Sequence, residues 1–515
     1  MKISLLSTDT VMICYGLRSI SSVLHKANHE TQLFFLLSSI QEEPRYSEKT
    51  LDQLAQMVKG SDLIGVSCMA YTSDRCKQVI KYLRKTNIPI IWGGINATLD
   101  PEGCLEHADM VCIGEGEEAA LELVTNLHQG GNWKHVPNIG HRENGKAIIN
   151  EVRPLIQNLD DLPIPDYDGN NHYILQDQAL VPADEFEYSR QTFNTTYLLH
   201  TTRGCVQRCT YCCNSKLKAI YSGKGKIVRK RSIENCVKEM EYVRAALPGR
   251  KYLWITDDSF FVRTLDELKE FGTKFKARVG IPYRCNGTPN TITEEKLAPL
   301  VETGLFQVRV GIQTGSERVA REIYRRPILN ERIKTAAAAL NKFKDEVDTA
   351  YQLIITNPYE EREDVLATIN LIRDLPPPYD LVIFNLVFFP GSEIYNYAVR
   401  DGIISGREDS CYELDFHDHD QGKHLERKSK NAYLNSLLYL MRGYAKRHHI
   451  GAIPRFLFPV LVNPNVVSLF ERFPSLTKMN IGLFETERRI YNLYKDTLSH
   501  VLKRNGSNGI QKEED

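Results

Sequence analysis

The sequence predicts an α/β protein built from three successive regions. In the first 130 residues, short apolar runs alternate with helical patterns, which is typical of a doubly wound parallel sheet. The same alternation resumes from Thr196 to about Arg400, where six strand-and-helix units fit a full or partial parallel (βα)6 barrel. Beyond Arg400 the pattern becomes mainly helical. The length of 515 residues is enough for two to four domains.

The composition is that of an ordinary soluble protein, with 42% hydrophobic and 25% charged residues. The 65 basic residues balance the 65 acidic residues, which argues against a protein built mainly to hold nucleic acid. No run reaches the roughly 20 apolar residues of a membrane helix, and the N-terminus does not resemble a signal peptide. We therefore expect a cytoplasmic protein. Twelve cysteines are too sparse for a disulfide scaffold.

The first region, residues 1–135, is predicted to fold as a Rossmann-like domain. Strands are expected at residues 2–7, 31–37, 62–68, 88–94 and 108–114, with helices at 72–85 and 117–128. The strands are continuously apolar, which fits burial on both faces of the sheet. Such sheets bind ligands at the carboxyl ends of their strands, where this chain has SCMAYTS, GGINAT and IGEGE.

The remaining regions follow from composition and periodicity. Residues 136–195, with the Asp- and Pro-rich stretch NLDDLPIPDYD, are expected to be a linker. Barrel strands are predicted at residues 196–202, 251–257, 281–287, 305–311, 350–356 and 381–389, within a domain spanning 196–404. A helical domain is expected over 405–504, with helices at 425–446 and 485–503. Residues 505–515 are expected to be a disordered tail.

The strongest motif is a cysteine cluster in TTRGCVQRCTYCCN. Cys205, Cys209 and Cys212 follow a predicted strand in a loop opened by Gly204. Thiolates suit iron–sulfur clusters and zinc, and three of them can hold three irons of a [4Fe–4S] cluster and leave the fourth iron open. The alternative is a structural zinc site or incidental cysteines, although zinc would need a fourth ligand. The side chain of Cys213 is expected to point away from Cys212.

This C-x3-C-x2-C spacing, with an aromatic residue before the last cysteine, resembles the signature of the radical S-adenosylmethionine (SAM) family. The resemblance implies that the amino and carboxylate groups of SAM chelate the open iron. It also implies that an electron from the cluster cleaves SAM to a 5′-deoxyadenosyl radical, which abstracts a substrate hydrogen. The family's glycine pair after the second strand is absent here.

The segments WITDDSF, YRCNGT and VRVGIQTGSE resemble the family's SAM-binding strand ends. A carboxylate at the second strand end would pair with the SAM ammonium group, although either acid could instead cap a helix. The resemblance assigns the SAM site to Tyr211, Asp257, Asp258, Arg284, Gln313 and Ser316.

Residues 1–130 resemble the cobalamin-binding domain that precedes the barrel in a large radical SAM subgroup. Glycines there would let the backbone approach a large flat ligand. The D-x-H-x-x-G motif that supplies a histidine to cobalt is missing, which implies a lower face without a protein histidine. The alternative is a vestigial domain that binds nothing. The resemblance assigns the cobalamin site to Ser67, Ser73, Gly93, Gly94, Asn96, Thr98, Gly114, Glu115 and Gly116.

Together these features predict a cobalamin-dependent radical SAM enzyme that methylates an unactivated carbon of a small molecule. One SAM would donate the methyl group and a second would supply the radical. The expected partners are a small-molecule substrate and an electron donor such as flavodoxin or ferredoxin. The alternatives are radical cyclisation, oxidation or rearrangement without methyl transfer, and a non-catalytic iron–sulfur or cobalamin sensor.

Two further segments carry weaker signals. KLKAIYSGKGKIVRKRS (Lys216–Ser232) has seven basic residues and no acid, which could contact phosphate or nucleic acid but is more typical of a solvated loop. CYELDFHDHDQGKH (Cys411–His424) has one cysteine and three histidines, in a spacing that matches no standard zinc site. We expect a polar loop over the barrel mouth there and no nucleic-acid partner.

Overall fold

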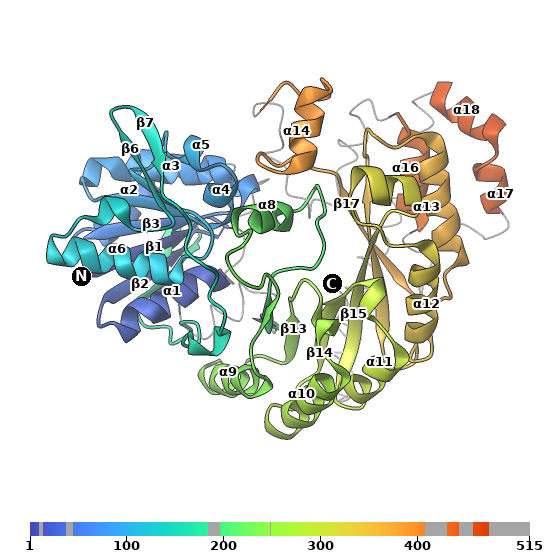
Figure 1. The fold of residues 1–515 in the computed structure, drawn as a ribbon, viewed down its shortest axis with the longest axis horizontal. Helices are drawn as coiled ribbons and strands as arrows, with labels where there is room; N and C mark the ends of the chain where they lie inside the picture. The colour runs from blue at the N-terminus through green and yellow to red at the C-terminus, as the bar shows by residue number, and fades with distance from the viewer. Residues whose placement is uncertain are drawn as a thin grey trace.

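The computed structural model describes residues 1–9, 14–37, 45–183, 196–247, 249–406, 430–441 and 457–472. It contains two α/β units side by side, with helices of the C-terminal region on the far side of the second unit (Figure 1). The segment 411–424, the predicted helix 485–503 and the tail 505–515 lie outside the described residues.

The first unit is built on a nine-stranded sheet with the order β7-β6-β5-β4-β3-β1-β2-β8-β9. The six central strands, β5-β4-β3-β1-β2-β8, are parallel to their neighbours. The hairpins β6–β7 and β8–β9 form antiparallel edges. The strands are β1 (Lys2–Ser7), β2 (Glu30–Phe35), β3 (Leu63–Ser67), β4 (Ile90–Gly93), β5 (Met110–Cys112), β6 (Ile139–Glu143), β7 (Lys146–Ile149), β8 (His172–Gln176) and β9 (Ala179–Pro182).

Helices cover both faces of this sheet, as the continuously apolar strands predict. Helices α1 (Tyr15–Lys26) and α6 (Glu117–Gln129) pack on the face to which Leu5 of β1 belongs. Helices α2 (Glu48–Met57) and α3 (Ser73–Leu83) pack on the opposite face, to which Leu6 belongs. The short helices α4 (Gly94–Leu99) and α5 (Pro101–Cys104) follow β4. The predicted Rossmann-like sheet is confirmed.

The expectation of an irregular linker after residue 135 is wrong for much of that segment. The four strands β6 to β9 lie within residues 139–182 and extend the first sheet at both edges. The periodicity is weak because β7 is largely exposed and β9 is an edge strand, so neither carries an apolar face on both sides.

The second unit is a partial barrel of six parallel strands in the order β10-β13-β14-β15-β16-β17, as predicted. Strands β10 and β17 are its two edges. The strands are β10 (Thr196–Leu199), β13 (Tyr252–Ile255), β14 (Tyr283–Gly287), β15 (Leu305–Gln313), β16 (Asp348–Ile355) and β17 (Asp380–Asn385). The intervening helices are α9 (Ile233–Ala246), α10 (Leu265–Arg278), α11 (Glu294–Val301), α12 (Asn330–Asn341) and α13 (Arg362–Asp374).

The described C-terminal helices are α14 (Glu393–Arg400), α16 (Ala432–Leu440), α17 (Phe458–Leu461) and α18 (Pro464–Arg472). Helix α16 lies within the predicted helix 425–446 and packs on α13 at the outside of the barrel. Within the described ranges, no helix has the length and apolar character needed to cross a membrane.

Candidate functional site

The three motif cysteines lie in a loop at the carboxyl end of β10. The base of this loop is a two-stranded ribbon, in which β11 (Thr202–Arg203) pairs antiparallel with β12 (Arg229–Lys230), and the loop leads into α8 (Cys213–Ile220). Gly204 has a φ of 87°, and a Cβ atom there would lie 2.2 Å from the carbonyl oxygen of Ile227. Only glycine fits this crossing, so the ribbon fixes where the cysteine loop begins.

Each of the three motif sulfurs receives an N–H donor. The backbone amide of Gln207 lies 3.4 Å from Cys205 Sγ, and the side-chain amide of Asn214 lies 3.6 Å from Cys212 Sγ. The guanidinium of Arg326 lies 3.7 Å from Cys209 Sγ. Burial raises the pKa of the Cys205 thiol to about 11, so ionisation there depends on a bound metal. The donor set therefore fits thiolate ligands of a metal cluster.

The spacing of the sulfurs favours a multi-iron cluster over a single zinc ion. Zinc–sulfur bonds of about 2.3 Å in tetrahedral geometry would bring ligand sulfurs to roughly 3.8 Å from one another. Across the described ranges, the only group of three His, Cys, Asp or Glu side chains with all ligand atoms within 4.8 Å is a different one, described below. The loop therefore spreads its cysteines more widely than one zinc ion requires.

The expectation for Cys213 is not met, because its thiol interacts with the thiol of Cys212, which lowers the pKa of Cys213. Cys212 is the N-cap residue of α8 and has an extended backbone, whereas Cys213 is the first helical residue.

The two acids that follow β13 (Tyr252–Ile255) have different hydrogen-bond partners. Asp257 is buried and accepts hydrogen bonds from the backbone amides of Thr201 (2.6 Å) and Thr202 (3.1 Å), so its carboxylate holds the segment that leads into the cysteine loop. Asp258 accepts a hydrogen bond from Asn214 at 3.1 Å, and burial raises the pKa of its carboxyl. Of the two predicted SAM ligands, only Asp258 faces the cysteine loop.

Tyr211 and Gln313 lie in strained or crowded surroundings near the loop. The Tyr211 ring packs edge-on against Tyr324, with the ring centroids 5.0 Å apart, and burial raises the pKa of its hydroxyl well above the usual range. Gln313 ends β15 at a register shift and has a φ of 74°, a left-handed conformation that is costly for a residue with a side chain. Such strain is concentrated at functional sites, which agrees with the predicted role of Gln313.

Arg284 and Ser316 already have partners within the protein. The Arg284 guanidinium stacks over the indole of Trp254 at 4.2 Å. The Ser316 hydroxyl donates to Asp364 at 2.5 Å in a buried network. A contact of either residue with SAM stays a prediction.

Most of the predicted cobalamin residues line one cavity. Ser73 and Asn96 do not belong to its lining: Ser73 is buried at the start of α3, and the Asn96 amide donates to Cys104 Sγ at 3.3 Å. The predicted residues that line the cavity are Ser67, Gly93, Gly94, Thr98, Gly114, Glu115 and Gly116.

The carboxyl ends of β4 and β5 form a glycine-rich edge, with Gly93, Gly94, Gly114 and Gly116. Two of these glycines are required by close contacts within the protein. Gly94 has a φ of 82°, and a Cβ atom there would lie 2.6 Å from Ser67 Oγ. Gly114 has a φ of 76°, and its Cβ atom would lie 1.9 Å from the hydroxyl oxygen of Tyr221. The expectation that the glycines leave room for a ligand is therefore incomplete, because protein atoms occupy the space beside these two.

The cavity has a volume of about 570 Å³ and lies between the two units. Strand ends of the first sheet, together with α1 and α6, form one wall and an apolar recess. The barrel contributes the other wall, including the base of the cysteine loop, through His200, Gly204, Asn214, Leu217, Tyr221 and Asp258. The structure thus brings the glycine-rich edge and the cysteine loop to a single cavity.

Ion pairs join the two units beside this cavity. Arg203 lies 2.6 Å from Glu117 and 3.2 Å from Glu115, and Arg229 lies 2.7 Å from Glu115. Burial would raise the pKa of the Glu117 carboxyl, but the Arg203 guanidinium outweighs this effect and holds the pKa below its usual range. The sequence analysis missed both arginines, because no local pattern shows that residues 86 to 114 positions apart will meet.

Comparison with known families assigns both units. Residues 1–124 match the B12 binding domain, and residues 199–372 match the radical SAM superfamily. The chain is a radical SAM enzyme with a B12-binding domain. Its cofactors are a [4Fe–4S] cluster, SAM and cobalamin.

Two curated relatives of this radical SAM enzyme are methyltransferases by name. An uncharacterized methyltransferase of Pyrococcus horikoshii is 27% identical over 393 residues, which cover 72% of this chain and 79% of the relative. The cytidylyl-2-hydroxyethylphosphonate methyltransferase of Streptomyces wedmorensis is 25% identical over 356 residues, which cover 62% of this chain and 64% of that protein.

Solved structures share the fold over most of the chain. The radical SAM methyltransferase TsrM from Kitasatospora setae matches with a TM-score of 0.67 at 16% identity, over 96% of this chain and 99% of that one. The cobalamin-dependent radical enzyme OxsB matches with a TM-score of 0.62 at 13% identity, over 97% of this chain and 75% of that one.

His200 is a cavity residue that the sequence analysis missed. It directly follows β10, packs edge-on against Tyr15 with the ring centroids 4.7 Å apart, and lies 3.2 Å from the Thr256 hydroxyl. Burial lowers the pKa of His200 to about 4, helped by Arg203 and Arg231. The imidazole is therefore neutral at physiological pH, and it faces the space between the two cofactor-binding units.

The basic segment 216–232 is largely neutralised inside the protein. Lys224 pairs with Glu151, Lys230 with Glu267 at 2.7 Å, and Arg231 with Glu239 at 2.6 Å. Arg229 is also paired, so most of the basic residues of this segment form ion pairs within the protein. This favours the interpretation as an ordinary loop over nucleic-acid binding.

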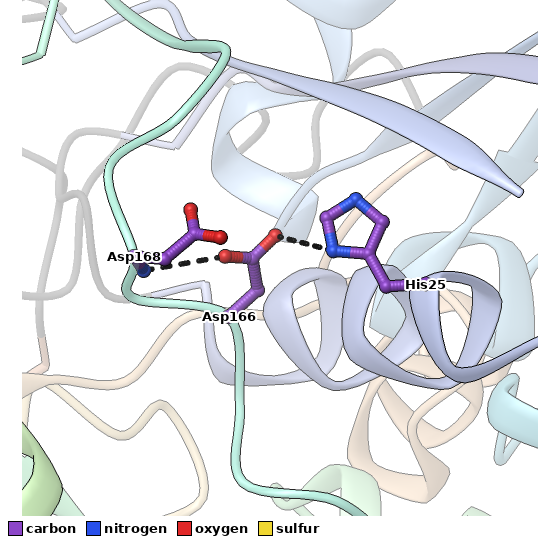
Figure 2. Close-up of side chains that lie close together, drawn as sticks. All are labelled: His25, Asp166 and Asp168. Atoms are coloured by element: carbon purple, nitrogen blue, oxygen red, sulfur yellow. Dashed lines mark hydrogen bonds and ion pairs between the residues drawn. The ribbon is translucent and has the colours of Figure 1, made fainter. Parts of the chain in front are cut away.

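A group of side chains outside the cavity has the composition of a metal site (Figure 2). His25, Asp166 and Asp168 bring their ligand atoms within 4.8 Å of one another. However, Asp166 already accepts from Ser21 at 2.6 Å, and His25 Nε2 lies 2.6 Å from the Thr31 hydroxyl. These contacts tie residues 166–168 to α1, and this structural role accounts for the group without a metal.

Proposed function

We propose that this radical SAM enzyme is a cobalamin-dependent methyltransferase that acts on an unactivated carbon of a small molecule. The observation that carries the proposal is the cavity of about 570 Å³ that the glycine-rich edge and the base of the cysteine loop share. Methyltransferases among the relatives support it.

Bound in this cavity, the cofactors would supply a methyl group from cobalamin and a 5′-deoxyadenosyl radical from SAM. Cys205, Cys209 and Cys212 would hold the cluster and leave one iron for SAM. Asp258 faces the same loop, and its carboxylate would pair with the SAM ammonium group. A one-electron donor such as flavodoxin or ferredoxin would serve as the partner.

The two units must keep a fixed distance for the methyl group to reach a substrate radical. The ion pairs of Arg203 with Glu115 and Glu117 cross between the units and are largely buried. The contact of Gly114 with Tyr221 adds a second fixed point, because the Glu115 amide donates to the Tyr221 hydroxyl at 2.8 Å. These contacts orient the glycine-rich edge toward the cysteine loop.

A second candidate is a radical reaction without methyl transfer. The anaerobic magnesium-protoporphyrin IX monomethyl ester cyclase of Rubrivivax gelatinosus is 23% identical over 337 residues, which cover 55% of that protein. A cyclase would use the same cysteine loop and the same SAM contacts. A sensor without catalysis would need no cavity that joins both cofactor sites.

The ratio of SAM products distinguishes these functions. A methyl-transfer cycle should release one S-adenosylhomocysteine and one 5′-deoxyadenosine per turnover, measured by chromatography. Candidate substrates come from comparing metabolites of cells with and without the protein, with labelled methyl groups traced. Release of 5′-deoxyadenosine alone during productive turnover would contradict methyl transfer and leave the radical SAM assignment intact. The variant with all three motif cysteines replaced by Ala is the control, and it should release no 5′-deoxyadenosine.

A further inference from the structure

Arg326 is a buried arginine in direct contact with the cysteine loop. Its side chain is 7% exposed, and it follows the turn formed by residues 319–323 after β15. One terminal nitrogen lies 3.7 Å from Cys209 Sγ, and the other donates to the carbonyl oxygen of Gly311 at 3.0 Å. Its Nε atom is buried and has no hydrogen-bond partner among the described residues.

The charge of Arg326 distinguishes it from other buried arginines near the site. Arg229 pairs with Glu115, and Arg231 pairs with Glu239. In the part of the chain that the structure describes, no carboxylate lies within 4.0 Å of Arg326, so it takes part in no ion pair there. The charge of Arg326 acts on the Asp258 carboxyl, although no contact ion pair joins the two side chains. A buried guanidinium is stabilised by an anion in direct contact, and the side-chain atom that Arg326 contacts is Cys209 Sγ.

The group that supplies this anion is the cluster itself. Cys209 is one of the three motif cysteines, and its thiolate, together with the other thiolates and the sulfides, makes the cluster region negative. We propose that Arg326 is the cation that balances the cluster charge and sets its reduction potential. It acts as a positioning residue, through the cluster rather than on the substrate.

The electrostatics give the direction of this effect. When the oxidised cluster accepts one electron from a one-electron donor, its negative charge grows by one. A cation in a dry environment next to a ligand sulfur stabilises the reduced cluster more than the oxidised one and so raises the potential. This inference rests on one part of the proposed function, namely that the three motif cysteines hold a cluster, and it does not depend on methyl transfer.

Potentiometric titration of the reconstituted holoprotein, followed by electron paramagnetic resonance of the reduced cluster, tests the proposal. Arg326→Gln removes the charge and should shift the potential to more negative values. Arg326→Lys keeps the charge and should remain near the wild-type potential. Arg325→Gln is the matched control, because the neighbouring Arg325 is exposed and pairs with Glu393, so its loss should leave the potential unchanged.

A wild-type potential in Arg326→Gln with full iron content would overturn the proposal. If Arg326→Gln assembles no cluster, Arg326→Lys decides: a full cluster at the wild-type potential supports the charge role, and a shifted potential or a lost cluster overturns it. Because the titration needs no substrate, failure of methyl transfer leaves its outcome unaffected. A wild-type protein without iron would instead refute the proposed function itself.

Discussion

Replacing Arg203 by Met should destabilise the joint between the two cofactor-binding units. The Glu117 side chain is 4% exposed and pairs with Arg203 at 2.6 Å. Without Arg203 the carboxylate would keep the hydrogen bond from the Ser19 hydroxyl at 2.9 Å but would lose its cation. Breaking a buried pair from one side typically costs about 3–5 kcal/mol, so we expect a loss of this size in the free energy of urea unfolding at pH 7. The exposed pair of Arg325 with Glu393 is the control, and Arg325→Met should cost at most about 1 kcal/mol.

The pH dependence of this loss provides a second test. In the wild type, Arg203 holds the pKa of Glu117 below its usual range, so the pair stabilises the fold above the unfolded pKa of the carboxyl and is lost only as the pH falls through the folded value. In Arg203→Met, burial remains and should raise this pKa, so the folded variant binds a proton that the unfolded chain releases. The deficit of the variant should therefore shrink between pH 7 and pH 5. A loss below 1 kcal/mol at pH 7, or a deficit that grows on acidification, would refute this reasoning.

The other predictions concern the cofactor sites. Gly114→Ala would place a Cβ atom 1.9 Å from the Tyr221 hydroxyl oxygen and should abolish cobalamin retention through gel filtration, whereas Gly130→Ala, also at positive φ but with open space around it, should retain one cobalamin per chain. Cys213→Ala should keep the iron content of the wild type, since three cysteines hold the cluster; loss of iron would make Cys213 a ligand. Electron paramagnetic resonance of the cobalt(II) form should lack nitrogen superhyperfine splitting from a protein histidine, and its presence would contradict an open lower face.

The fold could be predicted well wherever strands are buried on both faces. The prediction for β1 coincides with the observed bounds, and the six barrel strands all occur where expected. The missed hairpin β6–β7 did carry a signal, because its turn contains Asn144 and Gly145, both at positive φ. The hairpin β8–β9 turns through Asp177 and Gln178 without a glycine, so the sequence offered little to find it.

The site could be predicted less completely, because side-chain direction depends on contacts that are distant in sequence. Asp257 and Asp258 follow β13 and lie outside it, so strand alternation could not show which acid would face the site. Likewise, no local pattern would have found Arg203 or Arg326, whose partners are distant in sequence. Residue type and strand end predicted the region of the site, and tertiary packing decided which residues reach it.

The most direct measurement is the cofactor content of the anaerobically reconstituted protein, with and without its motif cysteines. The wild type should hold about four irons and four sulfides per chain, with broad visible absorption, together with one cobalamin. Replacing Cys205, Cys209 and Cys212 by Ala should remove the iron and its absorption but leave cobalamin bound, because the glycine-rich edge belongs to the first unit and the cysteines belong to the second. A wild type that carries zinc alone, or a triple variant that keeps a full cluster, would contradict the assignment of these cysteines.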